Sequence, residues 1–222
     1  KGVVLRHPFE VVGTMEEEGT RFGQVLLGSQ FITGVFGGKE LDSIKDPEGN
    51  TLREIRRSYL PRNVCPAYRK DDEILAFLEL HDEQGPVLED ENIDIGIVEG
   101  IVGISWLTVT VNGFAGHAGT VPMPLRQDAA TGACRLVNSI ALHTSRCYAD
   151  RATATVGKLE LLPGSSNCIP SKCTFTVDIR SAQMSNIDEL IEYIRKESRE
   201  VEKECNVEIN IYVNSRKEPI KL

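Results

Sequence analysis

The second half of the chain contains an ordered series of strand and helix patterns, and this order leaves few possible folds. Residues 172–180 alternate between apolar and polar side chains, which is the two-residue period of a strand with one buried face. Strand patterns occupy four segments: 105–113, 153–161, 172–180 and 207–213. Apolar residues at helical spacing occupy two segments: 125–143 and 185–204, the second with Ser185 as its expected cap. The order β-α-β-β-α-β predicts a ferredoxin-like α+β unit.

The first half has patterns that are typical of part of an α/β layer structure. Apolar runs at 9–14 and 74–81 predict buried strands, and each run ends at residues that are able to do chemistry. Helices are expected over 28–33 and after the capping residues 50–51. Glycine repeats at 100–103, which predicts the boundary between the two halves.

Composition restricts the possible partners. The chain has 33 Asp and Glu against 25 Lys and Arg, a formal net charge of −8, which argues against a nucleic-acid partner. It contains no apolar run near the roughly 18 residues of a membrane span and no signal peptide, so we expect a cytoplasmic protein. Its six cysteines form no C-x-x-C pair, and whether Cys168 and Cys173 form a disulfide stays open. The absence of an initiator Met suggests a piece of a longer protein.

Three adjacent carboxylates, Glu16, Glu17 and Glu18, follow the first apolar run. Like charges raise one another's pKa values, so a nearby cation would relieve the cost of this cluster. Neighbouring side chains in non-helical backbone point apart, so one carboxylate can bind a metal while the next contacts a bound water. The alternative is a solvated acidic turn that pairs with Arg21.

Two histidines occupy positions that favour ligand binding. His81 ends the second apolar run, at the carboxyl end of the predicted strand where open α/β sheets bind ligands, and imidazole is a suitable donor for zinc. His117 lies among small residues in the string GHAGT, which leaves room for a ligand or another chain. The alternatives are a His81 that stabilises a turn and a His117 that is simply exposed in a glycine-rich loop.

Asn167 and Arg180 form a further candidate pair. Arginine can bind a carboxylate through two hydrogen bonds, and asparagine adds a neutral donor. Because their segments flank adjacent strands, we predict that both residues lie on one edge of the sheet. The alternative is a surface arginine paired with an acidic neighbour.

Five strings in this order resemble one known family: EEEGTRF, LLGSQFITG, FLELHDEQGPVLE, GFAGHAGTVPM and PGSSNCIPSKCTFTVDIRS. The resemblance is to the hydantoinase/carbamoylase group of the zinc-dependent aminoacylase and carboxypeptidase superfamily. This group includes N-carbamoyl-L-amino-acid hydrolases, allantoate amidohydrolases and β-ureidopropionases. The resemblance implies a metallopeptidase-like α/β catalytic domain, partial over 1–103, an inserted lid and dimerisation domain over 104–214, and a return to the catalytic domain over 215–222.

The resemblance also implies a centre with two divalent metal ions, zinc or manganese. Glu17 matches the general base, Glu18 a metal-binding carboxylate and His81 a metal ligand. The metals would activate a water for attack on a carbamoyl carbonyl, with release of ammonia and carbon dioxide. The His-x-Asp motif and the downstream ligand His of the family are missing, since His7 and His143 do not fit them. The remaining ligands are therefore expected outside this chain, and the chain alone is expected to be inactive.

Substrate contacts are implied for four residues. Gln84, Asn167 and Arg180 match groups that hold a small ureido acid, with Arg180 on its carboxylate. His117 matches a lid histidine that reaches the active site of the partner subunit in a homodimer and stabilises the oxyanion. Asp82 departs from the apolar residue usual at its position, and two interpretations stay open: a neutral surface change, or a charge that acts on the neighbouring His81.

Three alternatives remain open. The first is a peptidase or aminoacylase of the same superfamily. The second is a dimerisation module without catalytic activity, because the chain alone lacks the ligands for two metals. The third is an acidic globular fragment whose motif matches are accidental.

Overall fold

The computed structural model describes residues 4–59, 70 and 73–222. Contacts divide the chain into two compact units, Lys1–Gln84 and Gly85–Leu222. Among the described residues, no helix is long and apolar enough to cross a membrane.

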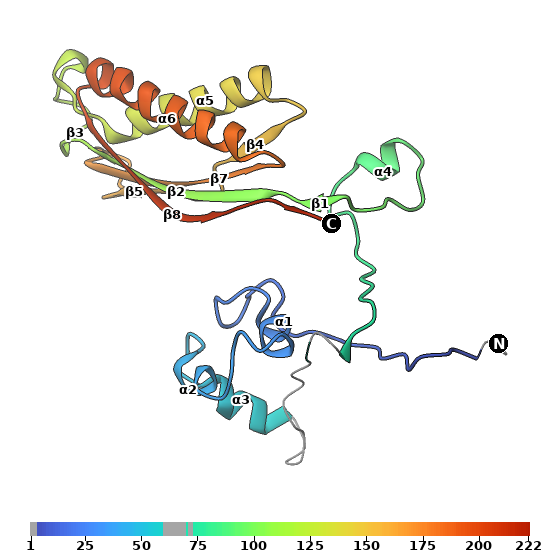
Figure 1. Cartoon of the computed structure of the whole chain (residues 1–222). Coiled ribbons are helices and arrows are strands. Elements are labelled where there is room, and N and C mark those ends of the chain that lie inside the picture. Colours follow the sequence, from blue (N-terminus) through green and yellow to red (C-terminus); the bar gives the residue numbers. More distant parts are fainter. Residues whose placement is uncertain (1–3, 60–69, 71–72) are drawn as a thin grey trace. The chain divides into compact units, whose positions relative to one another are not determined.

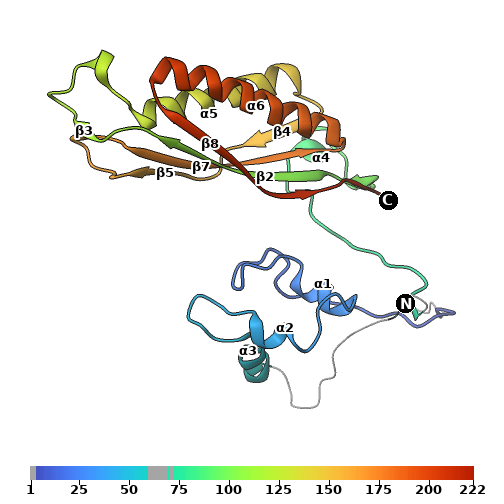
Figure 2. The ribbon, with the colours of Figure 1, turned by 60° about the vertical axis from the view of Figure 1, so that its left-hand side comes forward.

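The larger unit is built on an antiparallel sheet with two long helices on one of its faces (Figures 1 and 2). Its strands are β2 (Gly103–Asn112), β4 (Ala152–Thr155), β5 (Leu159–Leu162), β7 (Lys172–Ser181) and β8 (Glu208–Lys217). The strand order is β4-β7-β2-β8, and β5 also pairs with β7. The helices are α5 (Ala129–Cys147) and α6 (Met184–Cys205). The predicted succession of strands and helices in this half is present in the structure, except that the strand predicted over 153–161 is divided into β4 and β5.

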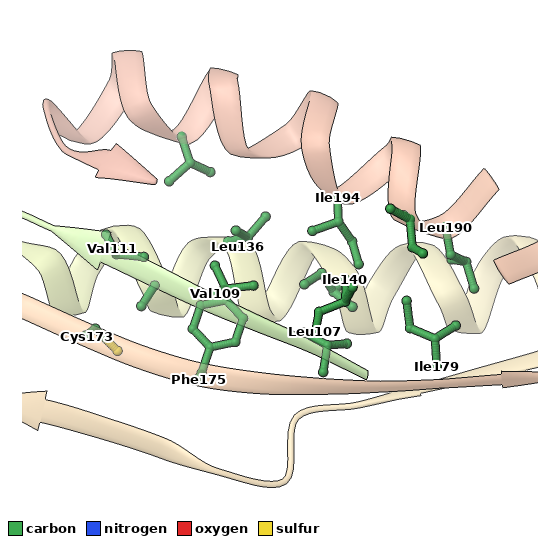
Figure 3. Close-up of a cluster of buried hydrophobic side chains, with 14 of the residues drawn as sticks. Leu107, Val109, Val111, Leu136, Ile140, Cys173, Phe175, Ile179, Leu190 and Ile194 are labelled. Atoms are coloured by element: carbon green, nitrogen blue, oxygen red, sulfur yellow. The ribbon is translucent and has the colours of Figure 1, made fainter. Parts of the chain in front are cut away.

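Alternation along the two central strands produces the core. β2 and β7 pair in one register over their whole length, so that Val109 lies opposite Phe175. Every second residue of each strand faces the helices, which is why the buried and partly buried positions alternate. Leu136 of α5 and Ile194 of α6 pack on these strand residues, and all four side chains are fully buried (Figure 3).

Both helix starts differ from the predicted ones. α5 begins at Ala129, later than expected, because the carboxylate of Asp128 accepts the N–H groups of Ala130 and Thr131 and caps the helix there. The predicted cap at Ser185 is wrong, since α6 has already begun at Met184. The hydroxyl of Ser181 instead orders this turn by accepting bonds from the Gln183 N–H and the Asn186 side chain.

Two strand predictions also need correction. The segment expected as one strand over 153–161 is two strands, β4 and β5, which pair with different parts of β7. β8 continues beyond Val213 to Lys217 because an extra residue, Asn214, is accommodated opposite β2. The register passes from Leu107 opposite Val213 to Trp106 opposite Ser215, and the hydroxyl of Thr108 donates to the Asn214 side chain at 2.8 Å.

Short elements complete this unit. They are α4 (Val87–Asp90), a two-stranded ladder of β1 (Gly100–Ile101) with β9 (Ile220–Lys221), a second ladder of β3 (Gly116–His117) with β6 (Cys168–Ile169), and a 3₁₀ turn over Met123–Leu125. The second ladder holds the loops at the end of the sheet where β2 ends and β7 begins.

The smaller unit contains α1 (Leu27–Ile32), α2 (Glu40–Ser43) and α3 (Leu52–Tyr59). The helix predicted over 28–33 and the helix predicted after the capping residues 50–51 are confirmed, and the Thr51 hydroxyl accepts the N–H of Glu54 at the start of α3. The strands predicted over 9–14 and 74–81 are wrong, because neither segment pairs with another strand among the described residues. Their apolar side chains are accordingly exposed, Phe77 by 75%.

The described cysteines are free thiols in very different surroundings, so the Cys168–Cys173 disulfide left open by the sequence is not formed. Burial raises the pKa of Cys173 to about 11, whereas Cys134 and Cys147 are exposed. Because the thiolate is the reactive form, iodoacetamide at about pH 8 should alkylate Cys134 and Cys147 in the native protein and leave Cys173 unmodified. Peptide mass spectrometry before and after unfolding in urea checks this, and native labelling of Cys173 at the rate of Cys134 would contradict it.

Candidate functional site

The acidic cluster forms a closed loop at the start of α1. The carboxylate of Glu16 accepts the backbone N–H groups of Arg21 at 3.1 Å and of Phe22 at 2.9 Å. The backbone carbonyl of Glu17 accepts the N–H of Leu26 at 2.8 Å. Glu16 therefore has a structural role in the loop, whereas the side chains of Glu17 and Glu18 are exposed to solvent.

Arg21 anchors this loop to a second one. Its guanidinium donates from Nη2 and Nε to one carboxylate oxygen of Asp46, at 2.9 and 3.2 Å. The Asp46 side chain is fully buried and also accepts the backbone and side-chain N–H groups of Asn50. The sequence left open an acidic turn that pairs with Arg21. The Arg21 guanidinium contacts Asp46 and not the glutamates, so this alternative is wrong for the guanidinium.

The Asp46 contact predicts an acid-sensitive loop. Burial acts to raise the pKa of Asp46, but hydrogen bonds from Asn50 and Arg21 outweigh it and hold the pKa below its ordinary value. A lowered folded-state pKa contributes stability above the unfolded value of about 3.9, and this contribution is lost as pH falls through the folded value. The protection of the Phe22 and Asn50 amides from hydrogen exchange, expressed relative to the intrinsic exchange rate at each pH, should therefore fall on acidification below about pH 4.

The control for this prediction is Asp46→Asn, which removes the titrating group while keeping its shape. In that variant the two amides should exchange faster already at neutral pH, with no further step attributable to residue 46 in acid. Equal acid steps in the wild type and the variant would contradict the assignment.

The segment after residue 80 lies beside the acidic loop. The ring Nδ1–H of His81 donates to the carbonyl of Asp82 at 2.5 Å, and the Nε2 of Gln84 donates to the Glu18 carboxylate at 3.3 Å. The hydrogen bond to the Asp82 carbonyl is the largest cause that raises the pKa of His81, and the negative charges of Asp82, Glu79 and Glu17 raise it further. Donation from Nδ1 leaves Nε2 as the lone-pair nitrogen of the neutral ring, which is the arrangement of a metal-binding histidine.

These residues supply only part of a metal site. A carboxylate from Glu18 and an imidazole from His81 are suitable donors for zinc. In the described residues, however, no three His, Cys, Asp or Glu side chains gather closely enough to hold an ion. The metal assignment of the pair stays a prediction, and it requires ligands beyond those described.

In the larger unit, the β3–β6 ladder brings together two of the predicted substrate groups. His117 pairs with Cys168, and the N–H of Ala118 donates to the carbonyl of Asn167 at 3.0 Å. The Ser165 hydroxyl donates to Oδ1 of Asn167 at 2.8 Å, which directs the amide nitrogen of Asn167 to other partners as a donor. Both His117 and Asn167 are exposed.

Arg180 lies near the other end of the sheet, opposite Ile104 of β2 and Thr153 of β4. Its Nε and Nη2 donate to the two carboxylate oxygens of Asp178, at 3.0 and 2.9 Å. The prediction that Asn167 and Arg180 share one edge is therefore wrong, because Asn167 precedes β7 and Arg180 comes near the end of the strand.

Two residues beside these groups were missed in the sequence. Asp178 faces the same side of β7 as Arg180, and the two-residue spacing Asp-x-Arg in a strand is the signal that indicates this pair. Arg126 donates from Nε to the carbonyl of Val121 at 3.0 Å and from Nη2 to the carbonyl of Ala118 at 2.7 Å. No periodic pattern indicates the Arg126 contacts, since they depend on the loop conformation.

The larger unit is similar to a known type of domain. Residues 100–206 match the family model described as a peptidase dimerisation domain. The match to this family model agrees with the mixed α/β architecture of the larger unit.

Similarity to known proteins extends over both units. The chain is 39% identical to the N-carbamoyl-L-amino-acid amidohydrolase of Paenarthrobacter aurescens, over 100% of this chain and 54% of that protein. It is 34% identical to the allantoate amidohydrolase of Escherichia coli (strain K12), over 96% of this chain and 52% of that protein. A hydantoinase/carbamoylase family amidase from Burkholderia ambifaria matches with a TM-score of 0.79 and 33% identity, over 93% of this chain and 50% of that one.

The chain thus spans about half the length of these relatives. The resemblance to the hydantoinase/carbamoylase group is confirmed by sequence and by structure, and the chain is a relative of its amidohydrolases.

Proposed function

We propose that the chain is part of a metal-dependent amidohydrolase that cleaves the carbamoyl C–N bond of N-carbamoyl-L-amino acids or of allantoate. The observation that carries the proposal is similarity along the entire chain to proteins named for these activities. The hydrogen bond from Gln84 to Glu18 and the effect of the Glu17 charge on His81 support it, because Glu17 is the predicted base and Glu18 and His81 are the predicted metal donors.

We further propose that two subunits share each active site. β7 has ten residues, and eight steps of about 3.3 Å separate its start at Lys172 from Arg180, about 26 Å in all. His117 and Asn167 lie beyond the start of that strand, so one small ureido acid cannot contact them and Arg180 in the same subunit. In a homodimer formed by a ferredoxin-like lid, His117 and Asn167 would act on the substrate bound by the partner.

The roles of the residues follow from their chemistry. Glu18 and His81, with further ligands, would hold divalent ions, zinc or manganese, that lower the pKa of a bound water. Glu17, exposed beside them, would take a proton from the attacking water and return it to the leaving nitrogen. Gln84 and Arg180 would orient the substrate, and His117 would donate a hydrogen bond to the developing oxyanion.

Two alternatives belong to other classes of protein. A peptidase or aminoacylase of the superfamily would cleave N-acyl or peptide substrates, and the match to a peptidase dimerisation domain is compatible with it. A non-catalytic dimerisation module would bind no substrate. Turnover by the full-length protein of N-carbamoyl amino acids and allantoate, against dipeptides and N-acetyl amino acids, separates the three, and removal of metal by a chelator should abolish the activity.

Mixing two nearly inactive variants tests the shared site. Glu17→Gln and His117→Ala should each keep no more than about 1% of the wild-type kcat as full-length homodimers. Half of the randomly mixed dimers contain both chains, and one of their two sites keeps both residues, so the mixture should recover up to about a quarter of wild-type activity. No recovery, with mixed dimers demonstrated by native mass spectrometry, would contradict the shared site.

A further inference from the structure

The imidazole of His117 has a defined hydrogen-bond partner although it lies at the surface. The backbone N–H of Gly119 donates to its Nδ1 at 3.1 Å. A Cβ at residue 119 would lie 3.3 Å from Cε1 of the ring, so the glycine also permits this close approach. Within the loop, the carbonyl of His117 accepts the N–H groups of Thr120 and Val121.

This contact determines which nitrogen of the neutral ring carries the proton. A backbone amide can only donate, so Nδ1 must accept with its lone pair. The single proton of the neutral imidazole is then on Nε2, on the opposite side of the ring from the loop. The loop thus presents an N–H donor to solvent or to a ligand.

Arg126 holds the same loop through two of its backbone carbonyls. Its planar guanidinium bridges the carbonyls of Ala118 and Val121, the residues that bracket the turn containing Gly119. Two donors in a rigid fork match two carbonyls at fixed separation, which the single flexible ammonium of lysine does not reproduce. The side chain is half-buried and follows the 3₁₀ turn that ends at Leu125.

We propose that Arg126 is a positioning residue that holds the 118–121 turn so that the Gly119 N–H keeps neutral His117 as the Nε2–H tautomer. Under the proposed function, on which this inference builds, that tautomer supplies the donor for the oxyanion at the partner's site. In this proposal Arg126 acts through the loop and through His117, and not directly on the substrate.

The first test reads the tautomer directly and needs no substrate. The full-length protein, labelled with ¹⁵N-histidine, is observed by NMR at about pH 8.5, two units above the ordinary histidine pKa of about 6.5. The wild type should show His117 with a protonated Nε2 and an unprotonated Nδ1. Arg126→Gln, and to a lesser degree Arg126→Lys, should shift both nitrogens toward the average of two exchanging tautomers. A predominant Nδ1–H form in the wild type, or no shift in Arg126→Gln, would overturn the proposal.

Matched controls separate this effect from general loss of structure. Arg195→Gln removes an exposed arginine of α6 that pairs with Glu192, and it should leave the His117 signals unchanged. His117→Ala assigns those signals, because the resonances of His117 are the ones missing from its spectrum. Where Arg126→Gln unfolds, Arg126→Lys carries the test at the same atoms.

The second test is kinetic. His117→Ala should lower kcat by about 10²- to 10³-fold, as for loss of an oxyanion donor, and Arg126→Gln by at least about tenfold but by less than His117→Ala, with KM little changed. A fall in kcat without a tautomer shift would overturn the positioning role. A wild type that turns over no ureido acid would refute the proposed function, while the NMR result would still decide the role of Arg126.

Discussion

Glu17→Gln is expected to lower kcat by about 10²- to 10⁴-fold in the full-length enzyme, with KM changed far less. The amide has nearly the shape of the carboxylate but cannot accept a proton, so the attacking water would lose its base and the leaving nitrogen its acid. The exposed position of Glu17 in a loop closed by Glu16 makes a purely structural effect small. Steady-state kinetics on the preferred N-carbamoyl substrate, with metal content measured in parallel, is the measurement.

Two other glutamates of the smaller unit provide the controls. Glu48→Gln, an exposed change elsewhere in the smaller unit, should leave kcat within about twofold of the wild type, as for most surface changes. Glu16→Gln should weaken the bonds to the Arg21 and Phe22 amides and be seen first as loss of loop order. A Glu17→Gln enzyme that keeps bound metal and a near-normal rate would remove Glu17 from the mechanism.

Phe175→Ala should cost about 3–5 kcal/mol of the free energy of unfolding, the usual range for loss of a buried aromatic side chain. Phe175 is fully buried at the centre of β7, opposite Val109, and lies beneath α5 and α6 (Figure 3). Its removal would leave a cavity between the sheet and both helices. Urea unfolding of the full-length protein, followed by circular dichroism, measures the loss.

Phe114→Ala is the matched control for that loss. Phe114 follows β2 and its side chain is 73% exposed, so its truncation should change the free energy of unfolding by no more than about 0.5 kcal/mol. A cost below about 1 kcal/mol for Phe175→Ala would mean that the core around β7 is not packed as the structure has it.

Local periodicity was sufficient to predict the larger unit but not the smaller one. Apolar and polar residues alternate so regularly in β2 and β7 that the sequence of each strand indicates its buried face. The two strands pair with each other in the structure. The apolar runs 9–14 and 74–81 are equally strand-like in sequence. A strand, however, forms only where neighbouring backbone accepts its hydrogen bonds, and the described chain supplies no such neighbour to either run.

The candidate site, too, could be predicted from the sequence only in part. Residue type and order were enough to single out Glu17, His81 and His117, but not to distinguish Glu16, whose carboxylate stabilises its own loop. The placement of Asn167 and Arg180 on one edge failed because a full strand lies between them. The contacts of Arg126 depend on backbone carbonyls, which carry no side-chain signature in a sequence.

The extra residue at Asn214 has a consequence for assembly. β8 is the outermost strand of its sheet, and an outermost strand with unpaired backbone groups can recruit further chains without limit. At Asn214 the strand bulges, and a straight incoming strand cannot keep its ladder of bonds past that point. The bulge therefore opposes the continuous addition of strands that a fibre requires along this edge of the sheet. The regular stretch of β8 before Asn214 can still pair with one short strand.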